Sequence, residues 1–208
     1  MLIANEKPLR LIGFPQSTMT QEIYDFMSRE FQGDIQIILP DEFIALDNKD
    51  LFQYHVSFTL DIDKRIEVIN IIDELDLDCI RYLHDTVVCH ADDITKVIGK
   101  GTIVCTYSTI LLGASIGKHC IIESYCLVAH YVNMADNVTM HAGSMIGGRT
   151  TIGKNCIFNF KSSAINAITV CDDVEVGAAS NLTKDVTVPG RYIGSVARHV
   201  GERILFQG

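Results

Sequence analysis

Three histidines in the second half of the chain offer the clearest chemistry, and they are spaced eleven residues apart: His119, His130 and His141. An imidazole with its ordinary pKa of about 6.5 can take a proton from an attacking amine or hydroxyl group near neutral pH. A nearby carboxylate such as Glu123 can stabilise the imidazolium that results. Whether these residues act together depends on the elements that bring them close to one another.

The histidines lie within a strict six-residue repeat that spans residues 98–186. Every sixth residue from Ile98 to Leu182 is apolar, and the residue four places further on, from Thr102 to Val186, is small or β-branched. A helix repeats its buried face at about 3.6 residues and a strand at about 2, so neither explains fifteen such hexads. The repeat predicts a parallel β-helix in which the apolar positions point inward.

Three hexads make one triangular coil, so residues eighteen apart in sequence become vertical neighbours. Two columns at or outside the corners, each with a histidine, follow from this spacing. One column contains Leu112, His130, Gly148, Asn166 and Lys184. The other contains Glu123, His141, Asn159 and Gly177. A backbone N–H near Gly148, directly above His130, is a candidate hydrogen-bond donor to a developing oxyanion.

The region before residue 84 follows a different pattern, in which apolar runs alternate with helical spacing. Strands are expected over 9–14, 35–39, 54–60 and 79–83, and helices over 21–31 and 64–75. Strands separated by helices of this length predict βαβ units on a small parallel sheet. We therefore expect a small Rossmann-like α/β domain over 1–84, followed by an all-β β-helix domain with a C-terminal tail over 85–208. Gln16, Ser17 and Asp41, at the ends of the first two strands, are the polar groups expected to bind an acceptor.

Composition limits the partners and the compartment. The formal charge is −9 with no long basic run, which argues against a nucleic-acid partner or an anionic membrane surface. The chain has neither an apolar stretch of about 18 residues nor an N-terminal signal segment, so the expected location is cytoplasmic. Cys120, Cys126 and Cys156 fall in the small-residue positions of the repeat, which predicts reduced thiols that pack in the core.

Several strings in the second half carry a resemblance to a known family: IGKG, SIGKHCIIES, LVAH, TMHAGSMIGG, TIGKNC, VEVGAASNLTKDV and GSVAR. From Ile98 onward the chain resembles the hexapeptide-repeat acyltransferases. Within them it is most similar to the sugar acetyltransferase branch, which includes sialic acid O-acetyltransferases and enzymes that N-acetylate UDP-4-amino sugars. The resemblance implies a left-handed coil, a homotrimer, acetyl-CoA as co-substrate in a groove between neighbouring prisms, and a sugar or nucleotide-sugar acceptor.

The resemblance also implies roles for single residues. Members of this branch carry a base histidine followed by Asp or Glu, and the matching segment LVAHY at 127–131 supplies His130 but places Tyr131 where the acid is expected. A neutral tyrosine cannot stabilise an imidazolium as a carboxylate does. Glu123 is the candidate for the missing charge, from the same subunit or from an adjacent one.

Contacts to acetyl-CoA are implied in the same way. Thr139 stands where the family places a second, acetyl-CoA-contacting histidine, and His141 is displaced from that position by two residues. Either His141 replaces that contact, or it is only a surface residue at a corner of the prism. Gly148, Phe160 and Ala178 correspond to groove residues. Cations expected near the CoA phosphates are Lys184, Arg191 and Arg198.

The N-terminal domain departs from the family pattern at its first turn. Relatives that bind nucleotide sugars have a Gly-Gly-His-Gly turn whose backbone N–H groups face phosphate. Here the segment 13–17 reads GFPQS, so only Gly13 remains. Either the acceptor is not a nucleotide sugar, or a nucleotide is held differently, with Gly13, Gln16, Ser17 and Asp41 as the candidate contacts.

Two other functions remain open. A non-catalytic trimeric scaffold, or a degenerate paralogue, would explain the altered turn and the missing acid after His130. Metal-dependent carbonic anhydrases use the same kind of prism with three histidine ligands, two of which sit five residues apart. The spacing of eleven places His119, His130 and His141 at different corners, so we expect no metal site.

Overall fold

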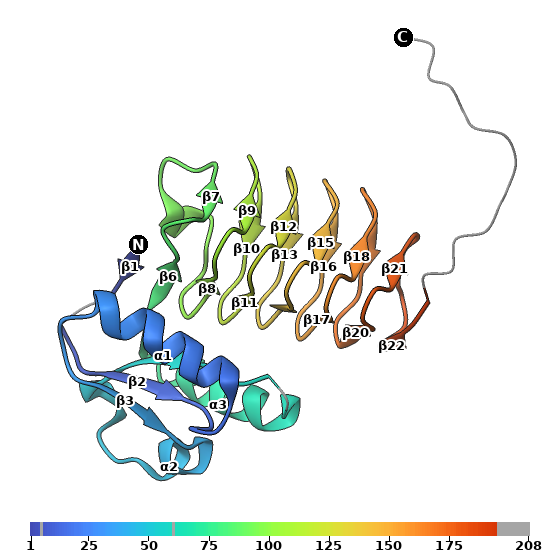
Figure 1. Cartoon of the computed structure of the whole chain (residues 1–208). Coiled ribbons are helices and arrows are strands. Elements are labelled where there is room, and N and C mark those ends of the chain that lie inside the picture. The colour runs from blue at the N-terminus through green and yellow to red at the C-terminus, as the bar shows by residue number, and fades with distance from the viewer. Residues whose placement is uncertain (5, 60, 195–208) are drawn as a thin grey trace, which may run out of the picture.

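The computed structural model describes residues 1–4, 6–59 and 61–194 and contains a small α/β domain next to a long β-prism (Figure 1). The α/β domain has a four-stranded parallel sheet of order β3-β2-β4-β5. Its strands are β2 (Leu9–Ile12), β3 (Ile35–Ile38), β4 (Gln53–Val56) and β5 (Asp78–Cys79). Its helices are α1 (Thr18–Glu30), α2 (Pro40–Ala45) and α3 (Ile62–Glu74), with a 3-10 turn at Lys49–Leu51.

Two apolar clusters hold this domain together. One joins Leu9 and Leu11 of β2 to Ile23 and Met27 of α1. The other contains Ile12, Tyr54 and Val56 from the sheet together with residues of α2 and α3. Because neighbouring residues of a strand point to opposite faces, both sides of this sheet are covered. The α/β arrangement expected from the sequence is confirmed, and α2, which Pro40 begins, is an additional helix.

The prism consists of three parallel sheets whose strands stack with the spacing that the repeat predicts. Ile122 of β11 pairs with Met140 of β14, and Met140 with Phe158 of β17, so each coil advances by eighteen residues. The prism strands are β6 (Arg81–Leu83), β7 (Val88–Cys89), β8 (Ile103–Val104), β9 (Thr109–Ile110), β10 (Ser115–Ile116), β11 (Ile121–Ile122), β12 (Leu127–Val128), β13 (Asn133–Met134), β14 (Thr139–Met140), β15 (Met145–Ile146), β16 (Thr151–Ile152), β17 (Ile157–Phe158), β18 (Ser163–Ala164), β19 (Thr169–Val170), β20 (Val174–Val176), β21 (Asn181–Leu182) and β22 (Gly190–Tyr192).

The inward positions of the hexads form one continuous core from Ile98 to Val186. Cys120, Cys126 and Cys156 are buried in it as free thiols, as predicted. At most corners one residue takes a left-handed backbone conformation, for example His119 with φ 56° and Tyr131 with φ 58°. Such single left-handed residues let the chain turn sharply between two-residue strands.

The prism begins earlier than the six-residue repeat does. Leu83 of β6 pairs with Val104, and Cys89 of β7 pairs with Ile110, so both pairs are separated by 21 residues instead of eighteen. A 3-10 turn at Ile94–Lys96 lies in this longer connection. The expected strand over 79–83 is therefore two strands: β5 completes the α/β sheet and β6 begins the prism. At the same edge, β1 (Leu2–Ile3) pairs antiparallel with β6.

The α/β domain is packed against one face of the prism. Outward residues of that face, Ile103, Cys105 and Ile121, belong to the same buried cluster as α1 and β2. On the other side, Arg65 of α3 is fully buried and donates to the carbonyl oxygen of His119 and the side chain of Asn137. The two domains therefore share a buried interface that extends around one corner of the prism. Among the described helices, none is long and apolar enough to cross a membrane.

Candidate functional site

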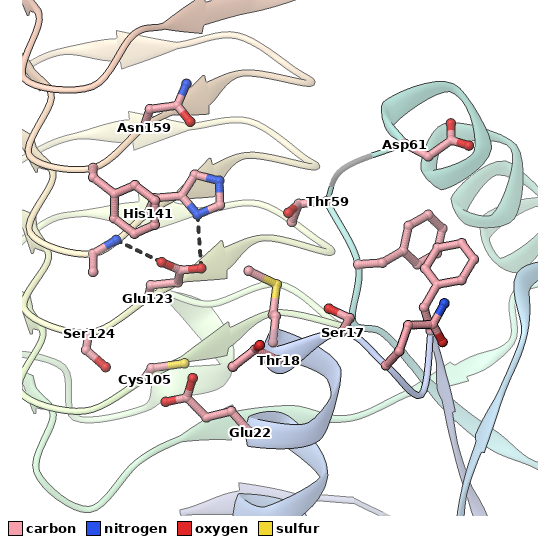
Figure 2. Close-up of a pocket in the computed structure, with 16 residues that line it drawn as sticks. Ser17, Thr18, Glu22, Thr59, Asp61, Cys105, Glu123, Ser124, His141 and Asn159 are labelled. Atoms are coloured by element: carbon pink, nitrogen blue, oxygen red, sulfur yellow. Dashed lines mark hydrogen bonds and ion pairs between the residues drawn. The ribbon is translucent and has the colours of Figure 1, made fainter.

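A pocket of about 840 Å³ lies between the α/β domain and the prism. Figure 2 shows its two walls, with α1 and the segment around Thr59 facing Cys105, Glu123 and His141. Its lining from the α/β domain is Phe14, Gln16, Ser17, Thr18, Met19, Glu22, Phe58, Thr59 and Asp61. Its lining from the prism is Cys105, Glu123, Ser124, His141, Ala142, Asn159 and Phe160.

The prism wall contains a histidine and a carboxylate in direct contact. His141 Nδ1 lies 2.9 Å from Glu123 Oε1, and the second carboxylate oxygen accepts the backbone N–H of Ala142 at 2.9 Å. The His141 ring stacks on Phe160, with ring centroids 5.1 Å apart. Both side chains are mostly buried, since His141 is 13% exposed and Glu123 19%. A carboxylate at Nδ1 fixes the tautomer that leaves the Nε2 lone pair free to accept a proton.

The opposite wall adds a second carboxylate. Glu22 projects from α1 toward the same pocket (Figure 2), and its pKa is raised by burial and by the negative charge of Glu123. Cys105, on the prism wall, is buried, and burial raises the pKa of its thiol above the usual range. A protonated thiol is a poor nucleophile, so Cys105 contributes packing rather than covalent chemistry.

The start of α1 forms a further edge of the pocket. Ser17 is the N-cap residue, but its side chain makes no capping hydrogen bond. The first-turn N–H groups of a helix lack internal partners and carry a partial positive charge. Beside them, the rings of Phe14 and Phe58 meet edge to face at 5.3 Å. This edge therefore combines an apolar surface with free backbone donors.

His130 lies at another corner, in a smaller pocket of about 320 Å³. Its neighbours there are Tyr131, Gly148, Arg149 and Asn166. The Arg149 guanidinium lies 5.6 Å from the centre of the Tyr131 ring. Within residues 1–4, 6–59 and 61–194, the His130 ring has no hydrogen-bond or ion-pair partner.

The predicted columns are confirmed, and they separate Glu123 from His130. Glu123 lies one coil from His141, to which it is hydrogen-bonded. His130 belongs to the other column, where its carbonyl oxygen accepts the N–H of Arg149 from the next coil. Within this chain Glu123 therefore supports His141 and not His130. The Gly148 N–H, the expected oxyanion donor, already donates to Asn166 Oδ1 at 2.9 Å. That donor is not free for a reacting oxygen.

The candidate acetyl-CoA contacts are scattered. Phe160 lines the large pocket, and Ala178 is exposed one coil above it. Thr139 is 3% exposed and pairs with Ile121, on the face of the prism that packs against the α/β domain. Lys184 is exposed above Asn166 in the stacking register. Arg191 pairs with Glu175 at 3.3 Å, and Arg198 lies outside the described residues.

Two of the four candidate acceptor residues line the pocket, namely Gln16 and Ser17. Gly13 is instead buried, and a Cβ atom there would lie 2.4 Å from Ser57 Oγ, so this glycine serves packing. The Asp41 side chain points into solvent and pairs with Lys64 at 3.1 Å. Sequence reasoning missed Glu22, because no spacing relates it to the repeat.

No group of three or more His, Cys, Asp and Glu side chains suited to a metal ion occurs in the described part of the chain. His119 is buried at the junction with α3, where its Nε2 lies 3.5 Å from Asp73. The three histidines therefore occupy three separate environments.

Together these features define the class of fold as a left-handed hexapeptide-repeat β-helix preceded by an α/β domain. Solved structures share it over nearly the whole chain. A GDP-perosamine N-acetyltransferase from Caulobacter crescentus, in complex with CoA and GDP-perosamine, superposes with a TM-score of 0.65 at 14% identity, over 97% of this chain and 100% of that one. The acetyltransferase domain of PglB from Neisseria gonorrhoeae, with acetyl-CoA bound, gives 0.62 at 14% identity, over 88% and 93%.

Sequence comparison adds a shorter match. A UDP-3-O-acylglucosamine N-acyltransferase from Bordetella avium is 30% identical over 79 residues, which is 38% of this chain and 22% of that protein. The chain thus spans about a fifth of the length of the curated relatives it matches. No family model matches the chain. The resemblance to hexapeptide-repeat acyltransferases is confirmed at the level of fold and in this shared segment.

Proposed function

We propose that the protein transfers an acetyl group from acetyl-CoA to an amino or hydroxyl group of a sugar or nucleotide sugar. The observation that carries this proposal is the pocket between the two domains, in which a histidine already hydrogen-bonded to a carboxylate faces free polar groups of α1. Solved proteins of this fold that act on GDP-perosamine or bind acetyl-CoA support it.

The transfer needs a base and a leaving thiolate. The acceptor nitrogen or oxygen attacks the thioester carbonyl, the new C–N or C–O bond forms, and the C–S bond breaks. The base takes the proton of the attacking group and returns it to the CoA sulfur. The resemblance assigns this role to His130, and the geometry of the large pocket offers His141 as the other candidate.

The acceptor would use the α/β domain. Gln16, Ser17 and the uncapped start of α1 suit a phosphate or a sugar hydroxyl, because helix N-termini bind anions through backbone N–H groups. Phe14 and Phe58 offer an apolar surface to a sugar ring or a base. A nucleotide would then be bound without the glycine-rich turn that relatives binding nucleotide sugars have.

Acetyl-CoA would lie along the same corner of the prism, above His141. Phe160 and Ala178 follow one another there in consecutive coils, and Lys184 and Arg191 are exposed cations in the last coil. In a homotrimer, which we propose from the resemblance, a neighbouring prism would complete this groove. The cytoplasm, where acetyl-CoA is available, is the proposed location.

The test is a thiol-release assay with acetyl-CoA over a panel of nucleotide-linked amino sugars, the corresponding free amino sugars and free sialic acids. We expect release with at least one acceptor and none without acceptor. Acetyl-CoA should also raise the melting temperature, since a ligand of the native state must stabilise it. No release with any acceptor and no thermal shift would leave the non-catalytic scaffold as the function.

A further inference from the structure

We infer that the proton acceptor of the transfer is His141, positioned by Glu123, and not His130, where the resemblance puts it. This inference rests on the proposed function and deepens it, since it names the base of the same site. His141 and His130 line different pockets, and only the pocket of His141 is also lined by the α/β domain of the same chain.

The first support is the fixed orientation of the His141 ring. Glu123 accepts two hydrogen bonds, one from His141 Nδ1 and one from the Ala142 N–H, both at 2.9 Å. Its carboxylate therefore cannot rotate away, and the imidazole cannot flip without losing its partner. Phe160 covers one face of the ring. In Figure 2 the second ring nitrogen of His141 points away from Glu123, so it remains available to a bound acceptor.

The second support is charge. Protonation of His141 places a cation between Glu123 and the pocket that Glu22 also lines. Glu123, in direct contact with the ring, stabilises an imidazolium in a partly buried site, and the exposed Glu22 adds a more strongly screened negative charge from the opposite wall. Burial, and after it the negative charge of Glu123, raise the pKa of Glu22, which lines the same pocket.

His130 lacks each of these features. Its ring is exposed, Tyr131 stands where an acid is expected, and the charged side chain of its small pocket is the cation Arg149. A guanidinium does not stabilise an imidazolium. The Gly148 N–H above it is occupied by Asn166. The α/β domain of the same chain contributes no described residue to that pocket.

In the resulting step the lone pair of an acceptor amine or hydroxyl attacks the thioester carbon while His141 Nε2 takes the proton from the attacking atom. The tetrahedral intermediate then collapses, the C–S bond breaks, and the imidazolium gives its proton to the CoA thiolate. Glu123 takes no proton in this step and acts only by holding and stabilising the ring.

The test compares His141→Gln, His130→Gln and Glu123→Gln, with His90→Gln as a matched control at an exposed histidine outside both pockets. With the best acceptor of the panel, we expect His141→Gln to lower kcat by about 10²–10⁴-fold, the usual contribution of a general base. His130→Gln should lose less than about tenfold, since it would lose only local contacts, and His90→Gln should match wild type. Circular dichroism and melting temperature check that each variant is folded.

The Glu123→Gln variant tests whether Glu123 positions and stabilises the His141 ring or only supports the fold. A glutamine keeps the size and an acceptor for His141 Nδ1–H but removes the charge that favours imidazolium. The acid limb of the kcat profile should therefore move to lower pH, with KM for acetyl-CoA little changed. If both histidine variants are inactive, an unmoved profile in Glu123→Gln overturns the inference.

The remaining outcomes are equally decisive. Activity that survives His141→Gln but not His130→Gln overturns the inference and leaves the proposed function in place. Absence of thiol release by the wild type with every acceptor overturns both.

Discussion

Arg65 Nε donates to Asn137 Oδ1 at 2.7 Å, so a helix of the α/β domain is hydrogen-bonded to a corner of the prism. The same guanidinium donates to the carbonyl oxygens of Val56, Phe58 and His119. Arg65 is fully buried, and burial lowers its pKa to about 10, which leaves it charged near neutral pH. One side chain thus fixes the wall of the pocket that carries Phe58 relative to the prism.

Arg65→Met should therefore destabilise the protein strongly. It leaves one amide oxygen and three carbonyl oxygens without their donors in a buried place, and we expect a loss of about 3–5 kcal/mol in the free energy of unfolding. Arg65→Lys keeps the charge but not the planar fork of donors, so it should recover only part of that loss. Urea unfolding measures both. Arg29→Met, at an exposed arginine of α1, is the control and should change stability by less than about 0.5 kcal/mol.

Acid should weaken the same junction. His119 is 1% exposed, and burial lowers its pKa to about 4, although Asp73 opposes the shift. The unfolded chain binds the proton near pH 6.5, so stability is fully present above that value and is lost as pH falls toward 4. The loss is at most about 1.4 kcal/mol per pH unit, or about 3 kcal/mol in all. His55, buried nearby with a lowered pKa, acts in the same direction.

A comparison of variants separates the contribution of His119 to the pH dependence of stability from that of carboxylates that titrate in the same range. His119→Gln should show a shallower decline of unfolding free energy between pH 6.5 and 4 than wild type, by up to about 3 kcal/mol at pH 4. His90→Gln, at an exposed histidine, should run parallel to wild type. Equal slopes in all three proteins would mean that His119 is not the titrating group.

Two phenylalanines separated by one residue should behave in opposite ways. Phe158 is fully buried in the prism core, and Phe160 is 55% exposed in the pocket. Phe158→Ala leaves a cavity that the stacked coils cannot close, so we expect a loss of about 3–5 kcal/mol. Phe160→Ala should change stability by less than about 0.5 kcal/mol and should instead lower the rate of transfer, because it releases one face of His141. Thermal unfolding and thiol release measure the two effects.

The sequence predicts the prism well because a fixed period encodes it. The hexads locate every inward residue from Ile98 onward, and the eighteen-residue coil correctly places Glu123 under His141. The repeat does not predict the first coil, because Leu83 and Val104 are separated by a longer connection that breaks the period.

The pocket could be predicted only on its prism side. Glu22 and Glu123 line the same pocket because two domains pack together, and no local pattern encodes that packing. For the same reason Thr139, an outward position of the repeat, looks accessible in sequence but is covered by the α/β domain. The partner of a histidine in a prism need not be next to it in sequence, since Glu123, eighteen residues before His141, lies 2.9 Å from its Nδ1.

Gly13 gives a prediction that separates packing from binding. In the family pattern a glycine here would face a ligand, yet its missing side chain leaves room for Ser57 and Thr20, whose oxygens lie 2.4 Å and 2.6 Å from a built Cβ atom. Gly13→Ala should therefore cost about 1–3 kcal/mol of stability through overpacking. Ser17→Ala is the matched control in the same turn: its side chain makes no capping bond, so its loss should cost less than about 0.5 kcal/mol. If Gly13→Ala were as stable as wild type but had a raised KM for the acceptor, Gly13 would be a ligand contact after all.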